Sequence, residues 1–142
     1  MSCFAAHMGL PKVFFAASHS RLLPGNTLKS IKHPKMTKEP DDVIPRLSEH
    51  TVWGSLTLFF TESPGLEVRD PNNQWHDVPV IPDGIIINIG DALSLWASKK
   101  LKSTVHRISW KKAPMNKDRY SIPYFVHPNF SKCFSLPRPM LL

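Results

Sequence analysis

Cysteine is scarce in this sequence of 142 residues, and the two that occur, Cys3 and Cys133, stand near opposite ends of the chain. No CxxC pair and no Cys/His spacing typical of a zinc site is present. A disulfide framework and a structural zinc site are therefore disfavoured. We expect free thiols in a reducing, cytoplasmic compartment.

Long apolar runs and acidic residues are also lacking. No stretch approaches the roughly 20 apolar residues that a membrane helix needs, so no membrane partner is expected. Only 11 Asp and Glu stand against 18 Lys and Arg, which gives a formal charge of +7, and basic residues crowd the stretch 99–119. Apolar strand positions interrupt these residues and no nucleic-acid motif accompanies them. We therefore interpret them as a solvated basic face and consider a nucleic-acid partner unlikely.

Proline, in contrast, is abundant at 14 residues, which argues against long helices. Short apolar or alternating segments separated by turn signals predict strands over 27–33, 49–62, 66–70, 75–80, 85–90, 102–110 and 119–128. Short helical turns are expected within 1–23, and a helical turn or a loop over 91–101. This pattern predicts a single all-β domain, either a sandwich or a barrel.

The stretch "SEHTVWGSLTLFF" has the pattern of a metal-binding strand, with a histidine followed by an alternating apolar run. Side chains alternate along a strand, so His50 is expected to share one face with Val52, Gly54 and Leu56. Glu49 would then point to the opposite face. A carboxylate is the expected partner of a metal-binding histidine two positions earlier, and Val52 stands there instead.

Three further polar residues are placed to join His50 inside such a barrel. His106 lies on the predicted strand 102–110, and Arg119 and Ser121 share one face of the last strand. Imidazoles suit Fe(II), Zn(II) or Cu(II). A buried guanidinium needs an anionic partner, and a carboxylate fits its fork best. The four groups together predict a pocket for a metal and an acidic co-substrate.

Six ordered blocks carry a resemblance to a known family. They read "HTVWGSLTLFF", "GLEV", "WHDVP", "INIGD", "STVHRI" and "RYSIPYF". The sequence resembles the catalytic domain of the Fe(II)- and 2-oxoglutarate-dependent oxygenases, in the isopenicillin N synthase-like branch. The resemblance implies an all-β fold, a double-stranded β-helix or jelly roll with minor helical segments. It also implies Fe(II) and 2-oxoglutarate as cofactors and a small-molecule substrate.

The resemblance also assigns roles to individual residues. His50 and His106 take the places of the two iron-binding histidines, and Val52 occupies the place of the iron-binding carboxylate. Arg119 and Ser121 take the places that hold the far carboxylate of 2-oxoglutarate. His33 stands where many relatives have a tyrosine that helps to hold 2-oxoglutarate, so it is a further candidate for cofactor binding.

The chain is shorter than the pattern of the family. Residues 1–26 are expected to be a remnant of the region that precedes the barrel, 27–130 the barrel itself, and 131–142 a shortened tail. With less cover over the barrel, we expect exposed apolar surface and self-association.

The absence of a carboxylate at position 52 determines which function we expect. We expect a member of the dioxygenase family that is impaired or inactive, a pseudoenzyme. A non-catalytic binding or interaction module on the same fold is the alternative. An oxygenase that uses only two histidines, or a halogenase with a halide in the vacant position, remains a lesser alternative.

Overall fold

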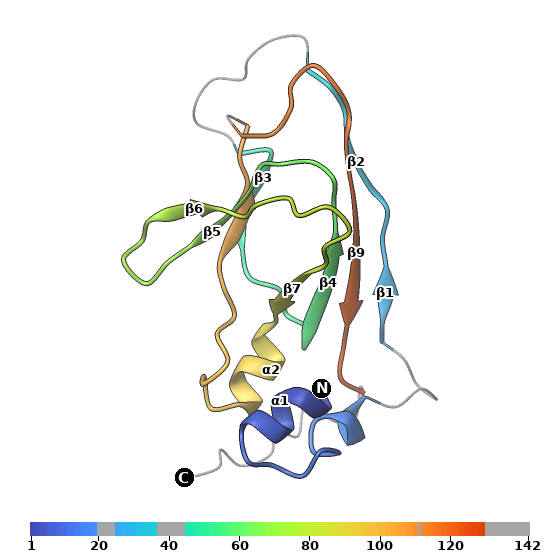
Figure 1. The fold of residues 1–142 in the computed structure, drawn as a ribbon, viewed down its shortest axis with the longest axis vertical. Helices are drawn as coiled ribbons and strands as arrows, with labels where there is room; N and C mark the ends of the chain where they lie inside the picture. The colour runs from blue at the N-terminus through green and yellow to red at the C-terminus, as the bar shows by residue number, and fades with distance from the viewer. Residues whose placement is uncertain (20–24, 37–44, 111, 130–142) are drawn as a thin grey trace.

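A computed structural model describes residues 1–19, 25–36, 45–110 and 112–129. Two antiparallel sheets face each other, with short helices at one end (Figure 1). The helical elements are α1 (Ser2–His7), the 3-10 turn η1 (Ala16–Ser18) and α2 (Asp91–Trp96). The strands are β1 (Thr27–Leu28), β2 (Ile31–His33), β3 (Leu47–His50), β4 (Leu56–Phe60), β5 (Leu66–Arg69), β6 (Trp75–Asp77), β7 (Ile86–Ile89), β8 (His106–Ile108) and β9 (Arg119–Val126).

The larger sheet has the order β1-β9-β4-β7, and β2 also pairs with β9. The long strand β9 alternates between buried and exposed residues along its first half, and Arg119, Ser121 and Pro123 are its buried positions. This period of two places one face of β9 toward the other sheet.

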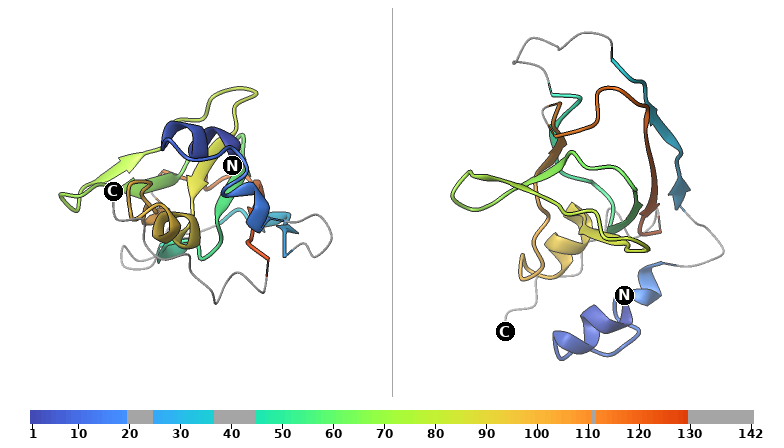
Figure 2. Two further views of the ribbon diagram at one scale, coloured as in Figure 1. Left: turned by 90° about the horizontal axis from the view of Figure 1, so that it is seen from below. Right: turned by 45° about the horizontal axis from the view of Figure 1, so that its top comes forward.

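The smaller sheet has the order β3-β8-β5-β6. β8 lies between β3 and β5, and β5 continues into the hairpin with β6 that projects from the barrel (Figure 2). The alternation of strands between the two sheets along the chain is that of a double-stranded β-helix. The predicted fold class is therefore confirmed.

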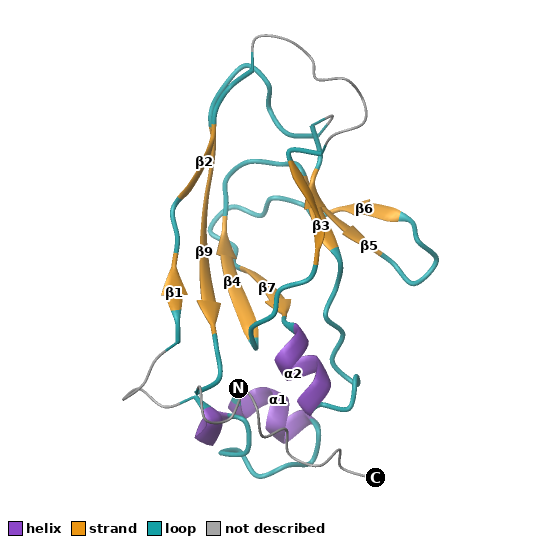
Figure 3. Cartoon of the chain, turned by 180° about the vertical axis from the view of Figure 1, so that it is seen from behind, coloured by secondary structure: helices purple, strands orange, loops and turns teal. Residues whose placement is uncertain are grey.

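The helices pack together at one end of the barrel (Figure 3). Phe15, Leu93 and Trp96 form the centre of the apolar cluster there, with Ala5 and Ala97. A second buried cluster, of Leu66, Ile108 and Ala113, lies between the sheets. The predicted helical turns near the N-terminus and over 91–101 are thus confirmed. In the part of the chain that the structure describes, no helix is long and apolar enough to cross a membrane.

The predicted strand 49–62 is wrong, because the structure has two separate strands there. The run 49–62 is not continuous, because β3 ends at His50 in the smaller sheet and β4 begins at Leu56 in the larger one. The intervening segment crosses the barrel and shifts the alternation. The cavity-facing positions are His50 and Val52 before the crossing but Thr57 and Phe59 after it. Leu56 therefore does not share the cavity face of His50, as the alternation had predicted.

The crossing segment is held against the start of α2. The amide of Asp91 donates to the Val52 carbonyl at 2.8 Å, and the Thr51 hydroxyl donates to the Asp91 carboxylate at 2.8 Å. A Cβ at Gly90 would lie 2.0 Å from the Gly54 carbonyl oxygen, so this approach requires glycine. The backbone at Val52 is consequently fixed by several neighbours.

The remaining strand predictions hold with shorter bounds. The predicted strand 27–33 consists of two separate pieces, β1 and β2, which both pair with β9. The predicted tail 131–142 and much of the predicted loop 34–46 lie outside the described residues. The division of the chain at residues 26 and 130 stays a prediction.

Candidate functional site

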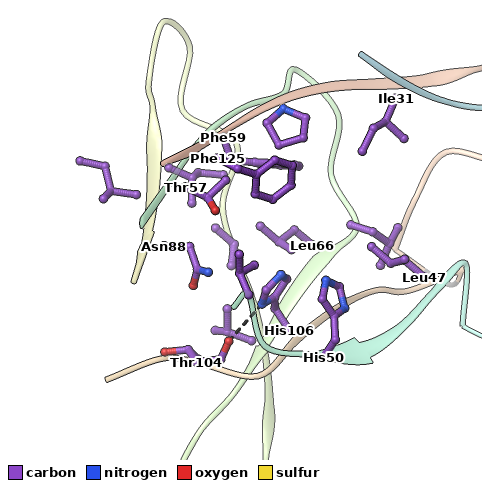
Figure 4. A pocket seen from close by; sticks show the side chains of 17 residues that line it. Ile31, Leu47, His50, Thr57, Phe59, Leu66, Asn88, Thr104, His106 and Phe125 are labelled. Atoms are coloured by element: carbon purple, nitrogen blue, oxygen red, sulfur yellow. Dashed lines mark hydrogen bonds between the residues drawn. The ribbon is translucent and has the colours of Figure 1, made fainter. Parts of the chain in front are cut away.

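A cavity of about 240 Å³ lies between the two sheets. In the part of the chain that the structure describes, seventeen residues line it, and twelve of them are apolar (Figure 4). The five polar ones are His50, Thr57, Asn88, Thr104 and His106. Such a small apolar pocket with a few polar groups is typical of a ligand site.

His50 and His106 lie side by side at this cavity. They are paired across β3 and β8, and their ring centroids are 4.4 Å apart with an angle of 52° between the planes. The predicted meeting of the two imidazoles is thus confirmed. His106 is half-buried, whereas His50 is exposed, so the pair lies where the cavity opens.

Backbone carbonyls fix the orientation of both rings. The Nδ1–H group of His50 donates to the Ser48 carbonyl at 2.8 Å, and that of His106 donates to the Thr104 carbonyl at 3.0 Å. This arrangement leaves each Nε2 with its lone pair, as in histidines that bind metals. Burial lowers the pKa of His106 below its usual value of 6.5, which favours the neutral ring.

The third position of a metal triad is apolar. Val52 lines the same cavity two residues after His50. Glu49 points away, because its carboxylate pairs with Arg69 at 3.3 Å on the outer surface, as the alternation predicts. Within the described ranges, no group of three or more His, Cys, Asp or Glu residues is placed to hold a metal ion.

Arg119 is fully buried at the start of β9. Its Nε–H donates to the Pro64 carbonyl at 3.1 Å, but its two terminal nitrogens have no hydrogen-bond partner among the described residues. Burial, followed by the charge of Arg46, lowers the pKa of Arg119 to about 10. Ser121, two residues further on the same face, is also buried. An uncompensated buried guanidinium is costly, so this place calls for an anion.

His33 and the cationic Arg46 lie beside Arg119. His33 pairs with Arg119 across β2 and β9, and burial together with the charges of Arg119 and Arg46 lowers the pKa of His33. Arg46 donates to the carbonyls of Pro34 and Pro114 and stacks 4.9 Å above the ring of Trp110. Sequence reasoning missed Arg46, whose place in a polar loop gave no signal of its position.

The predicted convergence of four polar groups in one pocket is only partly correct. His50 and His106 line the cavity, but Arg119 and Ser121 are not among the residues that line it. Ile31, which lines the cavity, pairs with Ser121 across β2 and β9. Ser121 and the fully buried Arg119 thus lie just beyond the closed side of the cavity, whereas His50 is exposed at its opening. The barrel interior therefore has a histidine end that is open and an arginine end that is closed.

The two ends differ in how well they suit the cofactors that the resemblance implies. The orphaned nitrogens of Arg119 fit the far carboxylate of 2-oxoglutarate, since a carboxylate can accept two parallel N–H groups from the guanidinium fork. The histidine end does not fit a complete iron triad, because two neutral imidazoles meet an isopropyl group where a charged ligand is expected.

Two facing antiparallel sheets with a histidine pair between them define the class of double-stranded β-helix proteins that is built around a metal centre. The model of the 2OG-Fe(II) oxygenase superfamily matches residues 29–128. The chain belongs to this family, whose cofactors are Fe(II) and 2-oxoglutarate.

Curated relatives and solved structures agree with this assignment. The chain is 35% identical to the proline hydroxylase buaE of Petromyces alliaceus over 91% of its own length and 42% of the relative's. It is 35% identical to the 2-oxoglutarate-dependent dioxygenase iboH of Amanita muscaria over 84% of its length and 59% of the relative's.

Among solved structures, Neurospora crassa T7H with alpha-KG and thymine superimposes with a TM-score of 0.80 and 36% identity, over 91% of this chain and 40% of that one. This chain thus spans less than half of the length of several relatives that it matches.

Proposed function

We propose that this chain is a 2-oxoglutarate oxygenase barrel that binds 2-oxoglutarate and has little or no turnover. The observation that carries the proposal is Val52 in the wall of the cavity, two residues after His50 and beside the His50–His106 pair. A ferrous ion in a complete triad supplies the oxidising chemistry of this family. Here the missing carboxylate removes both a ligand and a negative charge.

The charge balance supports this proposal. Two neutral imidazoles cannot offset the charge of a buried dication, and the carboxylate of Glu49 is engaged with Arg69 on the outer surface. Apolar side chains, including Val52 and Ile108, surround the pair. Weak Fe(II) binding is the expected consequence.

The arginine end supports retention of 2-oxoglutarate. In this proposal Arg119 holds the far carboxylate through its two terminal nitrogens, and Ser121 adds a hydroxyl contact from the same face of β9. His33, which pairs with Arg119 across the sheet, borders this site. The cationic surroundings from Arg46 favour the anion further.

The experiment measures binding and turnover separately. Binding of 2-oxoglutarate to the metal-free chain is followed by calorimetry, and succinate formation is followed with excess Fe(II) and ascorbate in air. We expect binding without succinate, and we expect Val52→Asp to bind 2-oxoglutarate and to gain succinate formation. Steady succinate formation by the natural chain would show that two histidines suffice, and the proposal would be wrong.

A non-catalytic binding module is the second candidate. The observation that favours it is the contrast between the two ends of the barrel interior. The buried Arg119 has two terminal nitrogens that can bind an anion, whereas the His50–His106 pair has no acidic residue beside it in the cavity wall that the structure describes. The two candidates differ in the Val52→Asp variant. Restored turnover indicates an oxygenase that has lost one ligand, whereas unchanged inactivity with intact 2-oxoglutarate binding indicates a binding module.

We also propose self-association through the edge strand β7. Among the described strands β7 pairs only with β4, so its other edge is free. Ile81, Ile85 and Ile87 are all more than half exposed beside this edge, and Asp83 is the only charged residue of the stretch 78–90. A free, apolar and nearly uncharged edge favours pairing with the same edge of a second copy.

A further inference from the structure

Thr57 and Asn88 form a polar pair on the wall of the cavity. They are direct partners across β4 and the edge strand β7, on the inner face of the larger sheet. Both line the cavity, and Figure 4 shows both side chains directed toward its interior. We call them the Thr57–Asn88 pair.

Each member has one buried side-chain atom without a hydrogen-bond partner among the described residues. Thr57 is only 4% exposed, and its Oγ1 has no partner, nor does the Nδ2 of Asn88, in the ranges that the structure describes. Buried polar atoms are normally satisfied, and an unsatisfied one costs free energy. The Oγ1 of Thr57 and the Nδ2 of Asn88, which are unsatisfied and lie on paired strands in one cavity, therefore indicate a ligand that forms hydrogen bonds with both.

The surroundings narrow the chemistry of that ligand. An amide and a hydroxyl each offer a donor and an acceptor, so together they match a molecule that presents a donor and an acceptor side by side. Among the described residues that line the cavity there is no Lys, Arg, Asp or Glu, and an uncompensated charge would be poorly solvated there. The volume of about 240 Å³ lies below the usual ~300–1,000 Å³ of drug-sized pockets, which indicates a compact ligand.

We infer that the Thr57–Asn88 pair recognises a small, neutral ring with a secondary amide edge, such as a lactam or a cyclic imide. This inference rests on the proposed function, in that 2-oxoglutarate is placed at Arg119 and the cavity is taken as the organic-substrate pocket of the oxygenase barrel. The amide edge bonds Thr57 and Asn88, and the apolar remainder of the ring packs toward the histidine pair on the opposite sheet.

Three matched probes test the inference on the full chain by NMR chemical-shift titration. 2-Pyrrolidinone carries both donor and acceptor, N-methyl-2-pyrrolidinone lacks the donor, and cyclopentanone offers the same ring size with an acceptor alone. One added hydrogen bond corresponds to roughly a fivefold difference in affinity. We expect 2-pyrrolidinone to bind at least about fivefold more tightly than either relative.

Substitutions in the cavity wall test whether the Thr57–Asn88 pair causes the preference for 2-pyrrolidinone. Thr57→Val keeps the side-chain shape and removes the hydroxyl, and Asn88→Leu removes the amide. Both should abolish the preference for 2-pyrrolidinone while they preserve or strengthen binding of cyclopentanone. Thr104→Val is the matched control, because Thr104 lines the same cavity from the other sheet. It should leave the preference unchanged, and retained cyclopentanone binding verifies that each variant is folded.

Several outcomes would overturn the inference. These are no binding of any probe by the natural chain, equal binding of all three, and survival of the preference in the double variant Thr57→Val/Asn88→Leu. A fourth outcome is that both substitutions weaken 2-oxoglutarate itself and 2-oxoglutarate displaces 2-pyrrolidinone, which would assign the pair to the co-substrate. None of these results alters the succinate measurement, so failure here is distinct from failure of the proposed function.

Discussion

The two ends of the barrel interior differ in which charged group is present and which is missing. At the histidine end, the imidazoles of His50 and His106 are oriented by backbone carbonyls, but Val52 provides no charge. At the arginine end, the guanidinium of Arg119 is buried with two orphaned nitrogens, so charge is present without its counterpart. The comparison teaches that the two ends of one barrel interior depend on separate side chains, because the arginine end has its charged residue and the histidine end lacks one.

The largest expected effect concerns the arginine end. Arg119→Leu should weaken 2-oxoglutarate binding by well over tenfold, since truncating one partner of a buried charge pair costs about 2–5 kcal/mol. Ser121→Ala should do less, because it removes one uncharged donor to the carboxylate, for about 1.5–3 kcal/mol. Calorimetric titration of both variants checks this ranking. Binding that does not depend on Arg119 would place 2-oxoglutarate elsewhere.

The same residue should affect stability in the opposite direction. Without a ligand, Arg119 is a buried charge without a carboxylate partner among the described residues. Arg119→Met should therefore leave the ligand-free protein equally stable or more stable, by up to about 1–4 kcal/mol. Urea unfolding measures this, and the stabilisation by 2-oxoglutarate should disappear. A clear loss of stability in the ligand-free variant would mean that the guanidinium has a structural role.

The edge strand β7 provides the next prediction. Ile85→Lys and Ile87→Lys place charges beside the free edge and should shift the protein toward monomer in analytical ultracentrifugation. The matched control is Ile122→Lys, on the exposed outer face of the inner strand β9, which should have little effect. Equal dissociation by the control would point to a general effect of charge. A monomeric natural chain would contradict the proposed self-association.

The smallest expected effect is a pH dependence at His19, which follows η1 and contacts Trp96 at the helical end of the barrel. Its Nε2 lies 2.8 Å from the Ser55 hydroxyl, and burial lowers its pKa from 6.5. The unfolded chain then binds more protons than the folded one, so this contribution to stability is complete above pH 6.5 and falls as the pH drops below it.

Urea midpoints at about pH 7.5 and about pH 5.5, on either side of the ordinary histidine pKa, test this expectation. His19→Gln should reduce the fall of the midpoint between the two. The fall of the midpoint that remains in this variant should come from His33 and His106, whose pKa values are also lowered by burial. An undiminished fall in the variant would exclude His19 as a source.

Sequence reasoning reached the histidine pair because strand alternation fixes the direction of His50 and His106 whatever residue 52 is. It failed at the crossing segment between His50 and Leu56, where the isolated Gly54 was the only sign of a break within the predicted strand 49–62. It also missed Arg46 and the Thr57–Asn88 pair. Their roles depend on strand register and on contacts between distant segments, which a single sequence does not display.

The central claim is that Val52 disables the metal end alone. An anaerobic equilibrium titration with Fe(II) tests it on the natural chain, on Val52→Asp, and on Val52→Asn as an uncharged control of similar shape. The fixed backbone at residue 52 should hold the new carboxylate beside the imidazoles. We predict a gain in Fe(II) affinity for Val52→Asp that exceeds the roughly 10–100-fold effect of an outer-shell group, and a much smaller gain for Val52→Asn. Fe(II) binding by the natural chain as tight as that of Val52→Asp would contradict the account.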